Sequence, residues 1–391
     1  MFATDVLKVL YAPHKVFKKI TQDPKYWGPL LVIILFIASQ SAFYYSTNLK
    51  TYYEQTSPNF ENLGAWTEDP GLWTTTSGAD ITSNYQDYLN SSLYGNSSLQ
   101  FSVADSSSLY LEMASFENVD CGPSGSENFS IRVKQIDPQV VPETVTLTLY
   151  SLSSSNTFEY DLTSEFSNAS LINVWNNITI PVGDDAPNWS SNGNPQWENI
   201  TGLRVDFSYP SSESNITLRV EGLFFRGTYQ TYTEMTLTGF VINALQLSLL
   251  QFASQWLVLT GVLYILIKGM KGNVVWKPLF VSVGFALVVM VVQALVNIAV
   301  TSTLPVLYYP VEWYAGLLVE ATVVTTAIAA QTETFSLITS IMQIATYAWT
   351  VALTAVITRI LVPEFTAIKS ILTCVAALVV TILITAILLG I

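Results

Sequence analysis

The sequence has only one histidine, His14, and two cysteines, Cys121 and Cys374, among its 391 residues. Ser-His-Asp and Cys-His arrangements need a histidine beside the nucleophile, and His14 precedes the polar block that fills the middle of the chain. Zinc sites draw mainly on cysteine and histidine, and these three residues are too few and too far apart. A phosphate-binding glycine loop and a nucleophile elbow are missing as well. We therefore predict that the protein is not an enzyme.

Carboxylates are the remaining candidates for catalysis, because glycoside hydrolases act with a pair of them. Glu68-Asp69 and Asp184-Asp185 are adjacent acid pairs in predicted loops. Adjacent loop acids are far more often part of a solvated surface, and this is the interpretation we prefer.

Charged residues are scarce, at 12% of the chain, while half of the residues are apolar, which is typical of a membrane protein. Several apolar segments match the ~20 residues that a helix needs to cross a bilayer. Five transmembrane helices are predicted, at 27–47, 238–267, 279–303, 335–360 and 371–390. The last four form a helical bundle within 235–391, with a separate outer-side helix near 311–332.

Basic residues predict the orientation of these helices, since cytoplasmic loops carry an excess of lysine and arginine. Residues 1–27 hold five lysines against two acids, and further basic residues cluster in 268–277 and 359–369. Five spans place all three segments in the cytoplasm, whereas a sixth span at 313–332 would move 359–369 outside and bury Glu320. The sequence thus predicts a plasma-membrane protein with a cytoplasmic N-terminus and a C-terminus on the extracellular side.

Residues 1–26 are predicted to form a cytoplasmic amphipathic segment. Pro13 suits the first turn of a short helix, in which Val16, Phe17 and Ile20 share one face. Lysines lie toward the other face, as in helices that bind anionic lipid headgroups. The alternative is that these lysines only fix the topology.

Between the first two spans lies a polar block, 48–232, which this topology places outside the cell. Residues 48–234 hold six basic and 23 acidic residues, and so acidic a surface argues against nucleic-acid binding. All Asn-x-Ser/Thr glycosylation patterns of the chain lie in this block. They begin at Asn90, Asn96, Asn128, Asn168, Asn177, Asn188, Asn199 and Asn215. The two cysteines are not expected to pair, which together with these patterns favours an archaeal cell surface.

Apolar residues of the polar block alternate with polar ones. Val145, Leu147 and Leu149, for example, are separated by threonines. Similar runs occur at 108–116, 129–134, 171–182, 203–207 and 216–221. Several short strands separated by turn-rich clusters indicate an extracellular all-β antiparallel sandwich, with Trp175 in its core.

The membrane part resembles the Yip family of Rab-interacting five-span membrane proteins, in the wide form that includes prokaryotic members. The resemblance covers 5–47 and 235–391, about half of the chain, and a large insertion after the first span departs from the family. It is carried by Ala12-Pro13, Val16-Phe17, Ile20, Pro24, Trp27, Pro29 and Leu30-Leu31, and by the Lys-Gly-rich turn at 268–278. The resemblance implies a role in membrane organisation or trafficking.

The polar block resembles the galactose-binding-type jelly roll of many carbohydrate-binding modules. The matching residues are Asn59-Phe60-Glu61, Trp66, 95–99, Trp175 with Ile178, Ile180 and Val182, and the closing segment 216–221. Such modules often hold one structural calcium ion between the first and last strands, and Glu61 and Glu221 stand at the corresponding positions. Calcium takes about six to eight oxygen ligands, so these two carboxylates alone do not complete a site.

Exposed aromatic side chains are the best candidates for ligand binding. Trp189 and Trp197 lie in a Gly/Asn/Pro-rich loop, and Trp73 lies in an early loop. Their indole rings are expected either to stack on sugar faces or to cover the end of the sandwich core.

Three functions follow from these patterns. The first is a non-enzymatic cell-surface protein, anchored in the lipid bilayer, whose glycosylated sandwich binds envelope glycan or a partner protein. The second is membrane organisation or trafficking through the bundle. The third is a transporter or an accessory subunit of a membrane complex. Transport predicts ionisable groups at mid-membrane, where Glu320 is the one candidate. Amides such as Gln251 and Gln255 are expected to cross-link helices.

Overall fold

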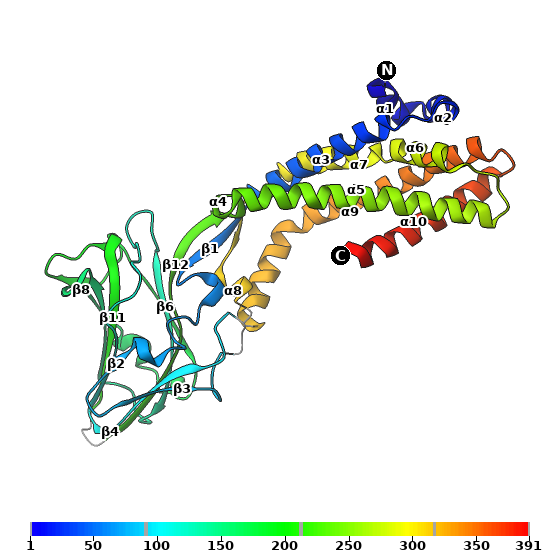
Figure 1. Ribbon diagram of the computed structural model, residues 1–391. Coiled ribbons are helices and arrows are strands. Elements are labelled where there is room, and N and C mark those ends of the chain that lie inside the picture. Colours follow the sequence, from blue (N-terminus) through cyan, green and yellow to red (C-terminus); the bar gives the residue numbers. More distant parts are fainter. Residues whose placement is uncertain (1, 90–92, 211–213, 316–317, 390–391) are drawn as a thin grey trace. The chain divides into compact units, whose positions relative to one another are not determined.

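The computed structural model describes residues 2–89, 93–210, 214–315 and 318–389 (Figure 1). The chain divides into two compact units, and each is described by itself. One unit, a β-sandwich, contains Tyr53–Gln230 and Tyr308–Ala327. The other, a bundle of apolar helices, contains Met1–Tyr52, Thr231–Leu307 and Ile328–Ile391. The predicted block 48–232 supplies most of the sandwich unit, but 308–327, expected in the bundle, also belongs to it.

The β-sandwich consists of two sheets whose named strand pairs are antiparallel. In the larger sheet the order is β13-β1-β12-β4-β3, with β6 beside β12 and β9 beside β6. Its strands are β1 (Thr51–Ser57), β3 (Asp80–Asn84), β4 (Ser98–Ser106), β6 (Asn128–Asp137), β9 (Asn176–Pro181), β12 (Ser214–Thr231) and β13 (Leu307–Tyr309). Short 3-10 helices connect several strands: η1 (Phe60–Asn62), η2 (Pro70–Leu72), η3 (Thr163–Phe166), η4 (Ala169–Leu171) and η5 (Trp197–Asn199).

The second sheet has the order β10-β8-β7-β11-β5-β2. Its strands are β2 (Thr74–Thr75), β5 (Ser108–Met113), β7 (Thr144–Ser151), β8 (Ser153–Asp161), β10 (Trp189–Asn192) and β11 (Ile200–Ser208). The main core lies between the sheets. The predicted alternation is confirmed, because the runs 145–149 of β7, 203–207 of β11 and 216–220 of β12 place every second residue in this core. The buried residues of these three runs are Val145, Leu147, Leu149, Leu203, Val205, Phe207, Ile216, Leu218 and Val220. Each such side chain stabilises the fold by roughly 1.5–3 kcal/mol.

A buried group of charges explains why 308–327 joins the sandwich unit. Arg226 on β12 donates from Nε to Glu54 on β1, at 3.0 Å, and from its two Nη atoms to Glu312 of the short helix α8 (Val311–Tyr314). The backbone N–H of Val311 donates to the other oxygen of Glu54, at 2.8 Å. Burial raises the pKa of Glu54, although the Arg226 charge opposes this shift.

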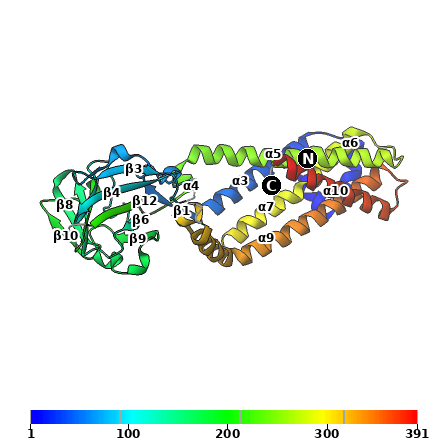
Figure 2. The same ribbon diagram turned by 90° about the horizontal axis from the view of Figure 1, so that it is seen from below.

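Five helices, or helix pairs, are long and apolar enough to cross a membrane. They are α3 (Trp27–Asn48), α5 (Leu237–Gly269), α6 (Trp276–Ala286) with α7 (Val288–Thr301), α9 (Leu318–Leu361) and α10 (Ala367–Leu389). A short helix, α4 (Tyr232–Met235), precedes α5 and is closed by a capping box between Thr231 and Glu234. The five predicted spans overlap these helices, and Figure 2 shows the bundle from a second direction.

The predicted division between an outer-side helix at 311–332 and a span at 335–360 is wrong. After the four-residue helix α8, a single helix, α9, runs without interruption for 44 residues. Its sequence contains neither proline nor glycine, so nothing in it breaks the helical hydrogen-bond ladder. The predicted third span, in contrast, is divided at Leu287 between α6 and α7. Glu320 lies in α9, but its side chain is outside the described part of the structure.

The N-terminal segment forms two helices, α1 (Phe2–Tyr11) and α2 (Pro13–Gln22). Pro13 begins α2, as predicted, and Val16, Phe17 and Ile20 share its buried face. That face packs into the core of the helical bundle, together with residues of α5, α6 and α9. It is therefore covered by protein and not free for insertion among lipids. Lys15, Lys18 and Lys19 on the other face are exposed, so headgroup binding by these lysines stays a prediction.

Candidate functional site

The three tryptophans predicted to stack on sugars do not present exposed rings. Trp73 and Trp197 are only 4% and 5% exposed and belong to the sandwich core. Trp197 stacks on Phe158, with ring centres 3.8 Å apart, and Trp189 packs edge-on against it. Trp189 is half-buried and donates from Nε1 to the Pro181 carbonyl. The indoles cover the core, because burying so large an apolar surface outweighs leaving it in water. Of the two expected roles, covering the sandwich core is the one that the positions of these tryptophans fit.

Trp175, predicted in the core, is half-buried at the start of β9 and donates to Asp87, at 3.3 Å. The two acid pairs lie in loops. Glu68 is half-buried and accepts from the backbone N–H of Asn96, at 2.7 Å. Asp184 and Asp185 are exposed, which fits the solvated surface preferred from the sequence.

The two carboxylates proposed for calcium lie in different environments. Glu61 is exposed on η1, whereas Glu221 on β12 is fully buried. The backbone N–H of Leu89 donates to Glu221 Oε2, at 2.6 Å, and Glu221 Oε1 has no hydrogen-bond partner among the described residues. Burial raises the pKa of Glu221 to about 8. No group of three or more acidic, cysteine or histidine side chains of the described residues is placed to hold a metal ion. A calcium ion held by Glu61 and Glu221 stays a prediction.

The glycosylation patterns of the described residues lie at the surface of the sandwich unit. Asparagine side chains are exposed at Asn96, Asn168, Asn177, Asn188 and Asn215. Asn128 and Asn199 are half-buried, and Asn90 lies outside the described residues. These positions leave room for a glycan at five of the predicted sites.

A different set of residues forms an ordered polar surface on the six-stranded sheet. The residues 110 and 112 on β5, 150 on β7, and 204 and 206 on β11 alternate with the core residues and face away from the core. We call this set the tyrosine–arginine patch. It consists of Tyr110, Glu112, Tyr150, Arg204 and Asp206.

Contacts within β11 and between neighbouring strands hold the patch together. Arg204 donates to both carboxylate oxygens of Asp206, at 2.8 and 2.6 Å, and its guanidinium lies 4.0 Å from the centre of the Tyr110 ring. The Tyr150 hydroxyl donates to Glu112, at 2.7 Å. Bidentate and charge-assisted bonds of this kind fix side-chain orientation. The patch is therefore organised before any ligand arrives.

A glycine makes room for one ring of the patch. An added Cβ at Gly202 on β11 would lie 2.9 Å from the Tyr150 ring and 2.7 Å from the carbonyl of Ala114. Tyr150 of β7 pairs with Gly202 of β11, and its hydroxyl reaches Glu112 on β5, the strand on the other side of β11. The Tyr150 side chain is only 7% exposed. Burial and the bond to Glu112 raise the pKa of its hydroxyl, so Tyr150 stays protonated at neutral pH and positions the Glu112 carboxylate.

The exposed groups of the patch define its chemistry. The side chains of Arg204 and Asp206 are 34% and 42% exposed, and Tyr110 and Glu112 are half-buried. The bond to Asp206 raises the pKa of Arg204, which therefore remains a cation. A guanidinium, two carboxylates and an aromatic ring offer donors, acceptors and an apolar face on one surface. The period-two pattern identified these strands, but no motif signalled that their outward residues would pair with one another.

No protein-family model matches the sequence, so the expected Yip-family resemblance gains no support there. No curated protein matches it either. Solved structures with partial likeness include a carbohydrate-binding module of the β-sandwich superfamily, at 14% identity and a TM-score of 0.26. That likeness covers 42% of this chain, which spans 58% of the length of the module's chain.

Two further neighbours are carbohydrate-binding modules by their descriptions. One is the family 11 module from Clostridium thermocellum in complex with a β-1,3-1,4-mixed-linked tetrasaccharide, at 12% identity and a TM-score of 0.26. The match covers 40% of this chain and 89% of the module's chain. The other is the CBM22-1 xylan-binding domain of Paenibacillus barcinonensis Xyn10C, at 12% identity and a TM-score of 0.21. That match covers 39% of this chain and 84% of the domain's chain. Identities and TM-scores this low carry no functional argument for this chain.

Proposed function

We propose that the protein is a non-enzymatic membrane protein whose β-sandwich binds an uncharged glycan on the tyrosine–arginine patch. The observation that carries this proposal is the paired, solvent-facing set of Tyr110, Glu112, Arg204 and Asp206 on one sheet. Binding sites commonly combine an apolar surface with a few fixed polar groups that orient the ligand. Sugar hydroxyls accept from the guanidinium and donate to the carboxylates, while the C–H face of a sugar ring packs on the tyrosine.

The charge of the patch favours a neutral ligand. One arginine faces two acids in the patch, and the exposed Glu159 on neighbouring β8 adds a further negative charge beside Thr148 of β7. Anionic glycans would be repelled by this excess of acid. Since the patch lies on a sheet surface, the contact area is modest, and we expect weak binding that favours chains of several sugars.

Membrane insertion and orientation are part of the same proposal. Five apolar helices match the length that a bilayer requires. The α5–α6 and α9–α10 turns lie at the same end of the bundle, and both carry basic residues, Lys268 and Lys271 in one and Arg359 and Lys369 in the other (Figure 1). Basic turns on one side favour a cytoplasmic location for that end. The sandwich would then be extracellular, and its exposed Asn-x-Ser/Thr sites would accept glycans.

Retention of polysaccharides by the full-length protein in mild detergent tests the proposal. Neutral and anionic polysaccharides of similar length are immobilised, and the wild type is compared with Arg204→Ala. We expect retention on neutral chains only and a loss of about tenfold in Arg204→Ala, which removes a bidentate donor worth about 1.4 kcal/mol.

Tyr85→Ala is the matched control, because Tyr85 is a 70% exposed tyrosine of the sandwich unit outside the patch. It should bind like the wild type. Retention that is equal in all three proteins, or stronger on anionic chains, would contradict glycan binding by this surface and favour a protein partner.

A further inference from the structure

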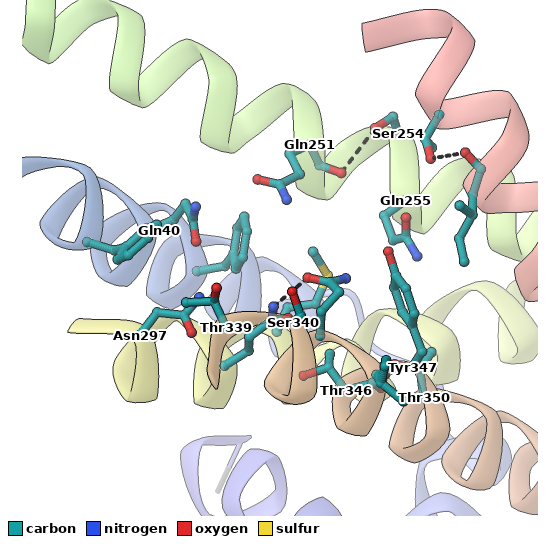
Figure 3. Close-up of a pocket in the computed structure, with 18 of the residues that line it drawn as sticks. Gln40, Gln251, Ser254, Gln255, Asn297, Thr339, Ser340, Thr346, Tyr347 and Thr350 are labelled. Atoms are coloured by element: carbon teal, nitrogen blue, oxygen red, sulfur yellow. Dashed lines mark hydrogen bonds between the residues drawn. The ribbon is translucent and has the colours of Figure 1, made fainter. Parts of the chain in front are cut away.

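The helical bundle contains a cavity of about 750 Å³ that no prediction anticipated (Figure 3). Helices α3, α5, α7, α9 and α10 all contribute to its wall. Six side-chain amides line it, although amides are otherwise uncommon in apolar helices. These are Gln40, Gln251, Gln255, Gln293, Asn297 and Gln343. Of the described residues that line the cavity, none carries a formal charge at neutral pH.

Two of these amides cross-link helices, as expected from the sequence, and the others do not do so among the described residues. Gln293 of α7 donates to Gln343 of α9, at 2.6 Å, and this pair is the cross-link. Asn297 is 8% exposed, and its side-chain oxygen has no hydrogen-bond partner within the described structure. Gln251 and Gln255 are half-buried one turn apart on α5, and Figure 3 shows both directed into the same space. A buried amide oxygen without a partner costs free energy, and the neighbouring amides can donate and accept, so the cavity suits a polar occupant.

The cavity lies in the half of the bundle that is farther from the basic turns. Gln255 and Gln251 precede the end of α5 at Gly269 by 14 and 18 residues, and Thr385 follows the start of α10 at Ala367 by 18 residues. At 1.5 Å per residue these distances are about 21 and 27 Å. The hydrocarbon core of a bilayer is about 30 Å thick. With the basic ends of α5 and α10 at the cytoplasmic surface, the cavity lies within the opposite leaflet.

The cavity reaches the flank of the bundle along α9. Ile344 lines it and is nevertheless 68% exposed, and Ser340, one turn before, is also exposed. Phe36, Phe43 and Phe335 form apolar parts of the wall. An opening on the side of a membrane helix faces lipid, so the occupant has both a polar and an apolar part.

We propose that this cavity binds the uncharged, hydroxyl-rich headgroup of a glycolipid. Amides both donate to and accept from hydroxyl groups, which suits a sugar. Phosphate would require arginine or lysine partners, which the described lining does not supply. A phosphate-free glycosyl headgroup on a glycerol lipid therefore fits both the lining and the depth. This proposal rests on the proposed membrane insertion and orientation of the helical bundle, and it is independent of glycan binding by the sandwich.

Native mass spectrometry of the full-length protein, released from nanodiscs, tests the assignment. The nanodiscs contain phosphatidylcholine with equal small fractions of phosphatidylglycerol and a diacylglycerol that carries an uncharged disaccharide. We expect the wild type to retain the glycolipid at least tenfold above either phospholipid. The Gln251→Leu/Gln255→Leu variant should lose this preference, because both amides are removed without loss of volume.

Gln246→Leu is the control, since Gln246 is an exposed amide of the same helix outside the cavity. It should retain the glycolipid like the wild type. The unfolding midpoint is measured for each protein, and Gln255→Leu alone replaces the double variant if that variant does not fold. Equal retention of all lipids, or unchanged glycolipid preference in the leucine variants, would overturn the proposal. Displacement of the glycolipid by an equal concentration of the free disaccharide would also overturn it, in favour of a soluble sugar.

Discussion

Polar side chains of the tyrosine–arginine patch are paired with one another, whereas several amides of the helical bundle face a cavity without partners. On the sandwich, Arg204 binds Asp206 and Tyr150 binds Glu112. In the bundle, Asn297 and Gln255 line an open volume. Water would satisfy any unpaired group on the sandwich, so pairing there fixes geometry. In the cavity, the buried oxygen of Asn297 has no partner in the described structure, and this is the observation behind the proposed occupant.

The largest effect should come from the sandwich core, where apolar side chains of the two sheets meet. Phe101 on β4 is fully buried and packs edge-on against Trp73. Phe101→Ala should lower the free energy of unfolding of the sandwich by about 3–5 kcal/mol, because it removes a large side chain and leaves a cavity. Hydrogen exchange of peptides from β4 and β12 in the full-length protein reports this loss. Tyr85→Ala, at the surface, should change it by less than about 0.5 kcal/mol.

Glu221 should make the stability of the sandwich depend on pH. Burial raises its pKa from 4.5 to about 8 in the folded state. Folding therefore takes up a proton, and this stabilising contribution is complete below pH 4.5 and is lost as pH rises to about 8. Glu221→Gln should abolish this dependence and be more stable than the wild type at pH 8, as measured by the same hydrogen exchange.

Glu61→Gln, which changes an exposed carboxylate, is the control and should keep the pH dependence. A wild type whose stability stays flat or rises between pH 5 and 8 would contradict the assignment. The same variants test the predicted calcium ion. If calcium binds Glu221, its addition at pH 8 will stabilise the wild type but not Glu221→Gln.

Sequence patterns predicted the sandwich more completely than either candidate site. Alternation in β7, β11 and β12 sufficed because one face of each strand is buried, so period two appears directly in the sequence. The tryptophans misled because a loop position does not reveal whether an indole turns inward, as Trp197 does. The patch depends on register, since Arg204 meets Glu112 and Thr148 only through strand pairing across long sequence distances.

In the bundle, hydropathy predicted the apolar helices but not their polar contacts. Length and composition identified all five apolar helices, whereas the continuity of α9 was not predicted because charged and polar residues near Glu333 resemble a boundary. Gln251 and Gln255 are four residues apart, which places them on one helix face. Whether that face meets another amide or a cavity depends on how five helices pack, and no single helix encodes this.

A smaller effect should distinguish the one amide cross-link from the cavity amides. Gln293→Leu removes the donor to Gln343 and should lower the stability of the bundle by about 0.6 kcal/mol, the average for such bonds between membrane helices. Gln246→Leu should have no effect. The stability of both variants is measured by unfolding the full-length protein with increasing amounts of a denaturing detergent. A loss above about 3 kcal/mol would show that amide pairing, and not apolar packing, holds the bundle together.

Glycan binding by the outer face of the six-stranded sheet can be followed by hydrogen exchange of the full-length protein, with and without the neutral oligosaccharide that is retained most strongly. On addition of the oligosaccharide, we expect slower exchange in wild-type peptides from β5, β7 and β11, and no change in β4, β6 or the apolar helices. Arg204→Ala should show no slowing. Slower exchange confined to other strands, or equal slowing in Arg204→Ala, would contradict glycan binding by this face.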